Sequence, residues 1–377
     1  MLTSPSTFCP RLQWFEMRLL RLVLAFALLA AALLPQKGEP VKTEVEKINR
    51  SAILIDTHND APLRILRGAD IGRRSREGHT DLPRLREGGV GAVFFAAYVP
   101  AGYVPKSQAA HRALEMLDAI REDIIGRCPQ DFLPALTAGD IEHAHRKGRV
   151  AVLIGVEGGH AIENSLRLLR AYYALGARYL TLTHVNTNDW ADSSGDIDNP
   201  KVPHHNGLTD FGRQVIAEMN RLGMIADISH VSDKTFWDVL EASRAPVFAS
   251  HSSCRALCND PRNMTDEMIV ALAKKGGVIQ INFNPGFLTK RPAPPANLAD
   301  VVAHIDHAVK LGGIDAVGLG SDFDGIDQVP AGLEDVSKFP NLTRALLEKG
   351  YSAAQIRQIY GGNTLRLMRA VEAGAGR

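Results

Sequence analysis

The chain has 377 residues, of which 45% are hydrophobic and 23% charged, so it can bury a large core and form about one to three domains. Its 43 basic and 42 acidic side chains nearly cancel. This balance argues against a nucleic-acid-binding surface, which needs a basic excess. A small uncharged or zwitterionic substrate is compatible with it.

Residues 1–36 are predicted to be a signal peptide or an N-terminal anchor. Arg18 and Arg21 precede an uncharged, alanine-containing apolar run at residues 22–34, which is the pattern of a secretory signal. The run is short for a membrane span, which needs about 20 residues. We therefore expect an exported protein, periplasmic or extracellular, whose residues 37–377 form a single domain. An uncleaved segment would anchor this domain to a membrane.

Apolar runs of strand length recur along the rest of the chain. Eight are present, at residues 52–56, 92–98, 150–156, 179–183, 224–228, 247–250, 278–283 and 316–320. They are nearly continuously hydrophobic, as expected of parallel strands that are buried on both faces. Segments with helical spacing lie between them, for example residues 109–121, 166–175, 211–222 and 301–311.

Eight strands that alternate with helices over roughly 270 residues predict a (β/α)8 TIM barrel. A doubly wound open sheet is the alternative, but it usually has fewer strands and a glycine-rich phosphate loop after the first one. Residues 155–159 are rich in glycine, yet they place Glu157 where a phosphate would approach. Two long segments, residues 186–207 and 287–297, are predicted to be loops over the functional site.

Metal-binding residue types follow six of the eight predicted strands. Barrel enzymes carry their chemistry at these strand ends, and scattered core histidines would not share one register. Imidazole and carboxylate groups suit a divalent transition metal, zinc first among them. The residues are His58 with Asp60, Glu157, His184, His230, His251, and Asp322 with Asp324.

Two ions in one site need about three protein ligands each, or a carboxylate that bridges them. Glu157 comes from the middle of the set and is followed by two glycines, so it is the natural bridge. His58 and Asp60 would complete the site of one ion, and His230 and His251 that of the other.

His184 and Asp322 are then left as the catalytic residues. Their groups suit polarisation of a carbonyl oxygen and proton transfer, respectively. Cys254 is not expected to bind metal, and it can either pair with Cys258 or stay free. Structural or solvated roles are expected for three further histidines, His160, His204 and His205.

Six motifs in this order resemble those of the membrane (renal) dipeptidase family. They are IDTHND at residues 55–60, GVEGGH at 155–160, LTLTH at 180–184, DISHVS at 227–232, SHSS at 250–253 and GSDFDG at 320–325. The likeness runs from about residue 53 to residue 366, which is nearly the whole of the chain after its N-terminal segment.

The resemblance implies a (β/α)8 barrel that hydrolyses dipeptides with two zinc ions. It implies the five metal ligands already deduced, with Glu157 bridging, and it makes Asp322 the proton carrier. His184 would contact the substrate carbonyl or the tetrahedral oxyanion. Arg262, which precedes Asn263, would bind the free C-terminal carboxylate through its planar fork. A hydroxide between the ions would attack the peptide carbonyl.

The resemblance also implies tolerance of a D-residue at the C-terminal position, and some members of the family open β-lactam rings. The family often has tryptophan shortly after the His-x-Asp pair, whereas residues 61–64 read Ala-Pro-Leu-Arg here. Two alternatives therefore stay open, a metal-dependent amidohydrolase acting on another small amide or lactam, and a catalytically silent binding barrel. The sequence also leaves the oligomeric state open, with a homodimer as one option.

Overall fold

The computed structural model describes residues 1, 39–293 and 295–376. Residues 45–377 form one compact unit. The predicted signal or anchor segment lies outside the described residues, apart from Met1. Within the described part of the chain, no helix is long and apolar enough to cross a membrane.

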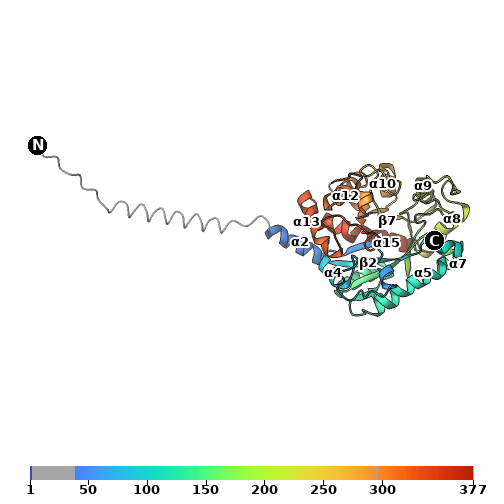
Figure 1. Cartoon of the computed structure of the whole chain (residues 1–377), viewed down its shortest axis with the longest axis horizontal. Coiled ribbons are helices and arrows are strands. Elements are labelled where there is room, and N and C mark those ends of the chain that lie inside the picture. The colour runs from blue at the N-terminus through green and yellow to red at the C-terminus, as the bar shows by residue number, and fades with distance from the viewer. Residues whose placement is uncertain (2–38, 294, 377) are drawn as a thin grey trace. The chain divides into compact units, whose positions relative to one another are not determined.

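Eight parallel strands form a closed ring, which confirms the predicted (β/α)8 barrel (Figure 1). Their order around the ring is β2-β1-β9-β8-β7-β6-β5-β4, and β4 pairs with β2 to close it. These strands are β1 (Leu54–Asn59), β2 (Val90–Tyr98), β4 (Val150–Glu157), β5 (Ala177–Thr181), β6 (Ile225–Asp227), β7 (Phe248–Ser252), β8 (Val278–Ile281) and β9 (Val317–Leu319).

A ninth strand, β3 (Phe132–Pro134), lies outside the ring and was not predicted. It pairs with the start of β4, and its three residues end in proline, so it has no periodic pattern to detect. The first strand was also predicted to end too early. β1 continues to Asn59, so His58 lies within the strand rather than after it.

Helices surround the strands and cover their outer faces (Figure 1). The four predicted helical segments correspond to α5, α7, α8 and α12, and α5 continues into the π-helical η2 (Ala119–Gly126). The helices are α2 (Glu39–Ser51), α3 (Ala61–Ile65), α4 (Leu82–Gly88), α5 (Ala109–Asp118), α6 (Ala138–Arg146), α7 (Leu166–Ala174), α8 (Asp210–Leu222), α9 (Asp233–Ala242), α10 (Asp266–Lys274), α11 (Pro285–Leu288), α12 (Leu298–Gly312), α13 (Phe339–Lys349), α14 (Ala353–Arg357) and α15 (Asn363–Gly374).

Three aromatic rings fill the interior of the barrel below the site. The ring of Tyr179 lies 5.3 Å from that of Phe94 and 5.4 Å from that of Phe248. These residues come from β5, β2 and β7, which are not neighbours in the ring, so their side chains must meet inside it. All three are fully buried, and they form an apolar floor on which polar residues at the strand ends rest.

Gly155 on β4 leaves the space that the Tyr179 ring occupies. A Cβ atom at this position would lie 1.8 Å from Cζ of Tyr179. We expect Gly155→Ala to lower the free energy of unfolding by about 3 kcal/mol, because neither the ring nor the strand can move aside in a packed interior. Urea unfolding monitored by circular dichroism measures this loss.

Gly139→Ala is the matched control, since a Cβ there would meet no atom closer than 3.7 Å. Alanine in helix α6 should raise the free energy of unfolding by no more than about 1 kcal/mol relative to wild type. Equal losses in the two variants would contradict the steric explanation.

Candidate metal centre

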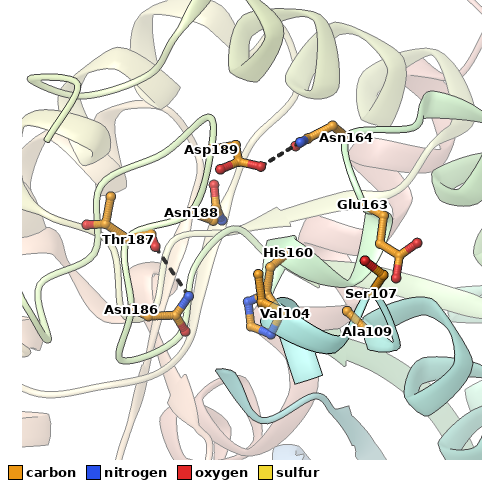
Figure 2. Close-up of a pocket in the computed structure, with 10 residues that line it drawn as sticks. All are labelled: Val104, Ser107, Ala109, His160, Glu163, Asn164, Asn186, Thr187, Asn188 and Asp189. Carbon is orange, nitrogen blue, oxygen red and sulfur yellow. Dashed lines mark hydrogen bonds between the residues drawn. The ribbon is translucent and has the colours of Figure 1, made fainter. Parts of the chain in front are cut away.

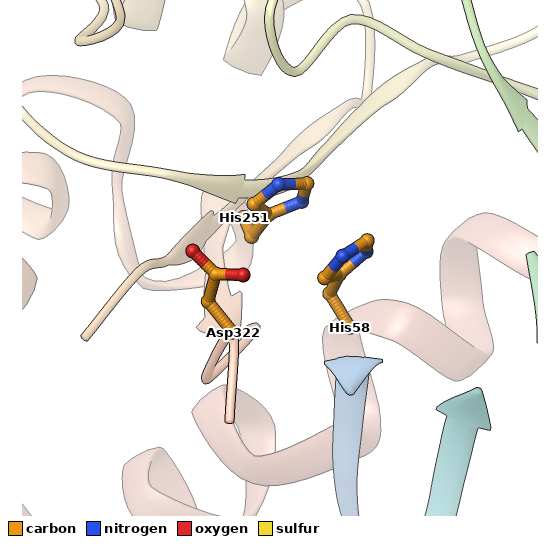
Figure 3. Close-up of side chains that lie close together, drawn as sticks. All are labelled: His58, His251 and Asp322. Carbon is orange, nitrogen blue, oxygen red and sulfur yellow. The ribbon is translucent and has the colours of Figure 1, made fainter. Parts of the chain in front are cut away.

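The structure brings the five predicted metal ligands and the two predicted catalytic residues, His184 and Asp322, together at the C-terminal mouth of the barrel. These seven residues are called the metal-centre residues below. Their potential ligand atoms form three overlapping groups, each within 4.8 Å: His58, His251 and Asp322; Glu157, His184 and His230; and His58, Asp60 and Glu157. Figure 3 shows the first group, in which side chains from three different strand ends point toward one another. His184 and Asp322, which were predicted to be catalytic rather than ligands, are therefore also within reach of an ion.

Glu157 lies at the centre of the set and faces four imidazoles. Its Oε1 atom is 3.2 Å from Nε2 of His230, 3.4 Å from that of His251 and 3.9 Å from that of His184, and its Oε2 atom is 3.6 Å from Nε2 of His58. The two carboxylate oxygens thus point toward different partners, which is the arrangement a bridging ligand requires.

Hydrogen bonds fix the tautomer of His251. The Ser250 hydroxyl donates to Oδ2 of Asp227 at 2.6 Å and lies 2.7 Å from Nδ1 of His251. Because the hydroxyl hydrogen is committed to the carboxylate, Nδ1 of His251 must donate to the hydroxyl oxygen. Its Nε2 atom therefore keeps a lone pair, 3.0 Å from Nε2 of His230.

The surroundings of Nε2 of His58 also favour a bound cation. The Nδ1 atom of His58 is 2.9 Å from the Tyr179 hydroxyl. Its buried Nε2 atom lies 3.2 Å from Oδ2 of Asp60 and 3.6 Å from Oε2 of Glu157. A buried nitrogen between two carboxylates is satisfied either by a proton or by a divalent ion, so the residues present fit a metal site.

Burial and neighbouring charges together set the protonation of these groups in the metal-free chain. Burial lowers the pKa of His58, but the neighbouring Tyr179, Glu157 and Asp60 outweigh it and raise that pKa well above the ordinary value. Burial raises the pKa of Asp60 to about 7 and lowers the pKa of His230 and His251 well below the ordinary value. Burial also opposes ionisation of Glu157, but the neighbouring His58 and His184 hold its pKa well below the usual range. The ionised Glu157 and the neutral His230 and His251 are already in the forms that bind a metal, whereas His58 has to release a proton when an ion binds.

Two buried aspartates that were not predicted as site residues hold the strand ends in register. Oδ1 of Asp227 accepts from the backbone N–H groups of Ser229 and Ser250, and its Oδ2 accepts from the hydroxyls of Ser250 and Thr181. Asp56 does the same between β1 and the segment after β9, where it accepts from the N–H and the hydroxyl of Ser321.

The sequence does contain a signal for these two aspartates. Asp56 and Asp227 both end an apolar run of the sequence and precede a metal-centre histidine by two or three residues. A charged group in such a run has to find several donors, because an unsatisfied buried carboxylate is costly.

Asp322 sits in a strained segment that a distant arginine supports. Asp322 and Asp324 both have a positive φ, 65° and 67°. The guanidinium of Arg64 donates to both carboxylate oxygens of Asp324, at 3.0 and 3.2 Å. The backbone N–H of His79 also donates to Oδ1 of Asp324, at 2.7 Å. Arg64 thus belongs to the support of the proposed proton carrier, a role that its sequence position did not indicate.

Arg262 lies at the edge of the metal centre and lines a cavity of about 470 Å³ together with His230. Its guanidinium donates to the Ser252 hydroxyl at 2.8 Å and to the His251 carbonyl at 2.7 Å. The buried Nε atom has no partner among the described residues. Both predicted loops reach this cavity, through residues 195–199 and through Phe287.

The remaining candidates lie outside the three ligand groups. Nε2 of His204 is 3.2 Å from the Asp196 carbonyl, and Nε2 of His205 is 2.9 Å from the Asn188 carbonyl. The thiol of Cys254 donates to the backbone of His304. Free thiols are found at Cys128, Cys254 and Cys258, so the pairing of Cys254 with Cys258 that the sequence left open is not formed.

A buried set of imidazoles and carboxylates at the mouth of a (β/α)8 barrel is the architecture of a metal-dependent hydrolase. Residues 42–377 match the model of the membrane dipeptidase family, peptidase family M19, and the chain belongs to this family of metallo-dipeptidases.

Similar proteins agree with this family. The dipeptidase aclJ of Aspergillus oryzae is 38% identical over 346 residues, which cover 88% of this chain and 81% of the relative. The crystal structure of the probable dipeptidase PvdM from Pseudomonas aeruginosa superposes with a TM-score of 0.83 at 26% identity, covering 90% of this chain and 100% of that one. The crystal structure of a metallo peptidase from Rhodobacter sphaeroides, liganded with a phosphinate mimic of the dipeptide L-Ala-D-Ala, superposes with a TM-score of 0.77 at 30% sequence identity. The match covers 85% of this chain and 100% of that one.

Asp227→Asn tests whether the carboxylate sets the tautomer of His251. The amide nitrogen no longer accepts the Ser250 hydrogen, which can then turn to Nδ1 of His251 and place the ring hydrogen on Nε2. We expect the affinity for zinc to fall about 10- to 100-fold, as measured by competition with a chromophoric chelator.

Thr181→Val is the control for this prediction. It removes one hydroxyl donor to Asp227 and leaves the bond from Ser250 in place. Its zinc affinity should stay within about 3-fold of wild type, well below the loss expected for a ligand-orienting residue. Similar losses in the two variants would show that general loosening, not the tautomer, weakens the site.

Proposed function

We propose that this chain hydrolyses free dipeptides with two zinc ions that are held by five ligands. The observation that carries the proposal is the buried Nε2 atom of His58 between two carboxylates, together with the convergence of three further imidazoles on Glu157. The proposed ligands are His58 and Asp60 for one ion, His230 and His251 for the other, and Glu157 as the bridge between them.

Zinc ions held by these residues would supply Lewis-acid chemistry, that is, polarisation of the substrate carbonyl and a lowered pKa of a water molecule. His184 is partly exposed at the mouth, so its imidazole can contact the substrate carbonyl oxygen and stabilise the negative charge that develops there. Asp322 is held by the amide of Asn282 at 3.0 Å and carries a proton to the leaving amine.

Arg262 supplies the selectivity for a free C-terminus in this proposal. Two of its nitrogens are held by Ser252 and the His251 carbonyl, while Nε is buried without a partner beside the cavity that it shares with His230. A substrate carboxylate is the group that complements a preorganised guanidinium. A longer peptide has an amide bond at the position where a dipeptide has its free carboxylate, so it would lose this interaction. Dipeptides are therefore preferred in this proposal.

Acceptance of a D-residue at the C-terminal position is part of the proposal. It is supported by the Rhodobacter sphaeroides relative, which is liganded with a phosphinate mimic of L-Ala-D-Ala.

Export of the protein is likewise proposed, from the basic and apolar pattern of residues 1–36. This segment would be either cleaved or kept as an anchor.

Hydrolysis of a panel of free dipeptides tests the reaction and its metal. The panel includes L,D pairs, tripeptides and N-blocked dipeptides, and the protein is assayed before and after chelation and zinc return. We expect cleavage confined to dipeptides, lost on chelation and restored by zinc, with two zinc ions per chain by elemental analysis.

Glu157→Gln should bind fewer than two ions and lose activity by at least about 100-fold, because it removes the bridging charge. An intact pair of ions that cleaves no dipeptide would instead favour another small amide as substrate. Normal turnover by the variant would rule out the bridging role.

Arg262→Ala should raise KM for free dipeptides about 10- to 100-fold, because a charge-assisted pair is lost. KM for C-terminally amidated dipeptides should change less than about 3-fold, since they lack the carboxylate. Steady-state kinetics on both substrate types give the ratio. Arg170→Ala, which removes a surface ion pair with Glu218, is the control and should leave the ratio unchanged. Equal effects of Arg262→Ala on both substrate types would contradict a carboxylate clamp.

A further inference from the structure

A second cavity, of about 250 Å³, is lined by residues from the segments after β2, β4 and β5 (Figure 2). Its walls come from residues 104–109, residues 160–164 and residues 186–189. Asn186 follows His184 by two residues, so their Cα atoms are at most about 8 Å apart. Val185, between them, lines the cavity of Arg262 instead. The segment that directly follows His184 therefore contributes to the walls of both cavities.

Two hydrogen-bond acceptors on residues that line this cavity have no partner among the described residues, although neighbouring atoms cover both of them. His160 is 6% exposed, and its Nε2 atom donates to the Val99 carbonyl at 2.8 Å. That bond places the ring hydrogen on Nε2, and burial lowers the pKa of His160, so Nδ1 keeps its lone pair. Across residues 39–293 and 295–376, neither this Nδ1 atom nor Oδ1 of Asn186 has a hydrogen-bond partner.

Two carboxylates add negative charge at the rim. Oδ2 of Asp189 accepts from the amide of Asn164 at 2.6 Å, and Oε1 of Glu163 accepts from the backbone N–H of Ala110 at 3.1 Å. Both donors are neutral, so the two charges are not compensated by these contacts. The cavity thus offers acceptors and negative charge, and a ligand that fits it must bring donors and positive charge.

The backbone around the cavity is held in an unusual conformation. Ser107, Glu163 and Asn164 line it, and all three have a positive φ, between 44° and 55°. Such a conformation costs about 1–3 kcal/mol for a residue with a side chain and is typically maintained at functional sites. The same conformation occurs at His230 and Asp322 in the metal centre.

We propose that this cavity is the subsite for the side chain of the N-terminal residue of the substrate, and that it selects a primary ammonium group such as that of lysine. The proposal rests on the proposed dipeptidase function. With the substrate carbonyl at His184 and its carboxylate at Arg262, the N-terminal residue is directed toward the second cavity. An ammonium group has three donors and no acceptor, and the flexible lysine stem can carry it past His184 to the carboxylates of Glu163 and Asp189.

Kinetics on lysyl-alanine and norleucyl-alanine test the proposal, because the norleucine side chain has the same stem without the ammonium group. We expect kcat/KM to favour lysyl-alanine about 10-fold in the wild type, the size expected of one charge-assisted hydrogen bond. The double substitution Glu163→Gln with Asp189→Asn should reduce this preference to about 2-fold or less. Glu122→Gln, an exposed carboxylate on η2, is the control and should keep the full preference.

Calorimetry on the chelated protein gives a readout that does not depend on turnover. The Kd of lysyl-alanine should be lower than that of norleucyl-alanine, and the ratio of the two Kd values should move toward one in the double variant. If no dipeptide is cleaved after zinc return but lysyl-alanine binds preferentially, the dipeptidase function fails and the subsite stands. Equal kcat/KM and equal Kd for the two dipeptides, or a preference that survives the double substitution, would overturn the subsite.

Discussion

The hydrogen bonds of the Asp227 carboxylate are the constraint on which the rest of the site depends. They join the ends of β5, β6 and β7, and they decide which nitrogen of His251 carries the hydrogen. Asp56 repeats this arrangement between β1 and the segment after β9. Because each carboxylate accepts from backbone N–H groups that would otherwise be buried and unpaired, the same atoms stabilise the barrel and orient the lone pairs of the metal centre.

The polar mouth is possible because an apolar floor lies directly beneath it. Tyr179 belongs to both layers: its ring packs on Phe94 and Phe248, and its hydroxyl reaches Nδ1 of His58. Gly155 provides room for that ring. Water is excluded from below, and in such a medium the charges around Glu157 interact more strongly than they would in solvent. A cation is therefore the natural complement of this end of the barrel.

The sequence was sufficient to predict the barrel and the gathering of its seven metal-centre residues, because parallel strands buried on both faces leave a strong apolar signal and their ends meet at one edge. It was insufficient where structure depends on non-local contacts. β3 is too short and ends in Pro134, the support of Asp324 comes from Arg64 in a distant segment, and the hydrogen-bond role of Asp227 depends on strands that pair only in the folded chain. The second cavity was missed for the same reason, since three separate segments form it.

The two cavities that the segment after His184 helps to line differ in charge, and this difference bears on the orientation of the substrate. The guanidinium of Arg262 lines one cavity, and the carboxylates of Glu163 and Asp189 line the other. In the proposed binding mode, a dipeptide with an N-terminal lysine that lies across them would gain energy in one direction and lose it in the reverse direction, so one orientation would be favoured. That orientation would place the amide between the cavities, near His184, Asp322 and the proposed metal ligands. A longer peptide that begins with lysine would carry its C-terminal carboxylate beyond Arg262, which is a physical reason for a site of this shape to act on dipeptides.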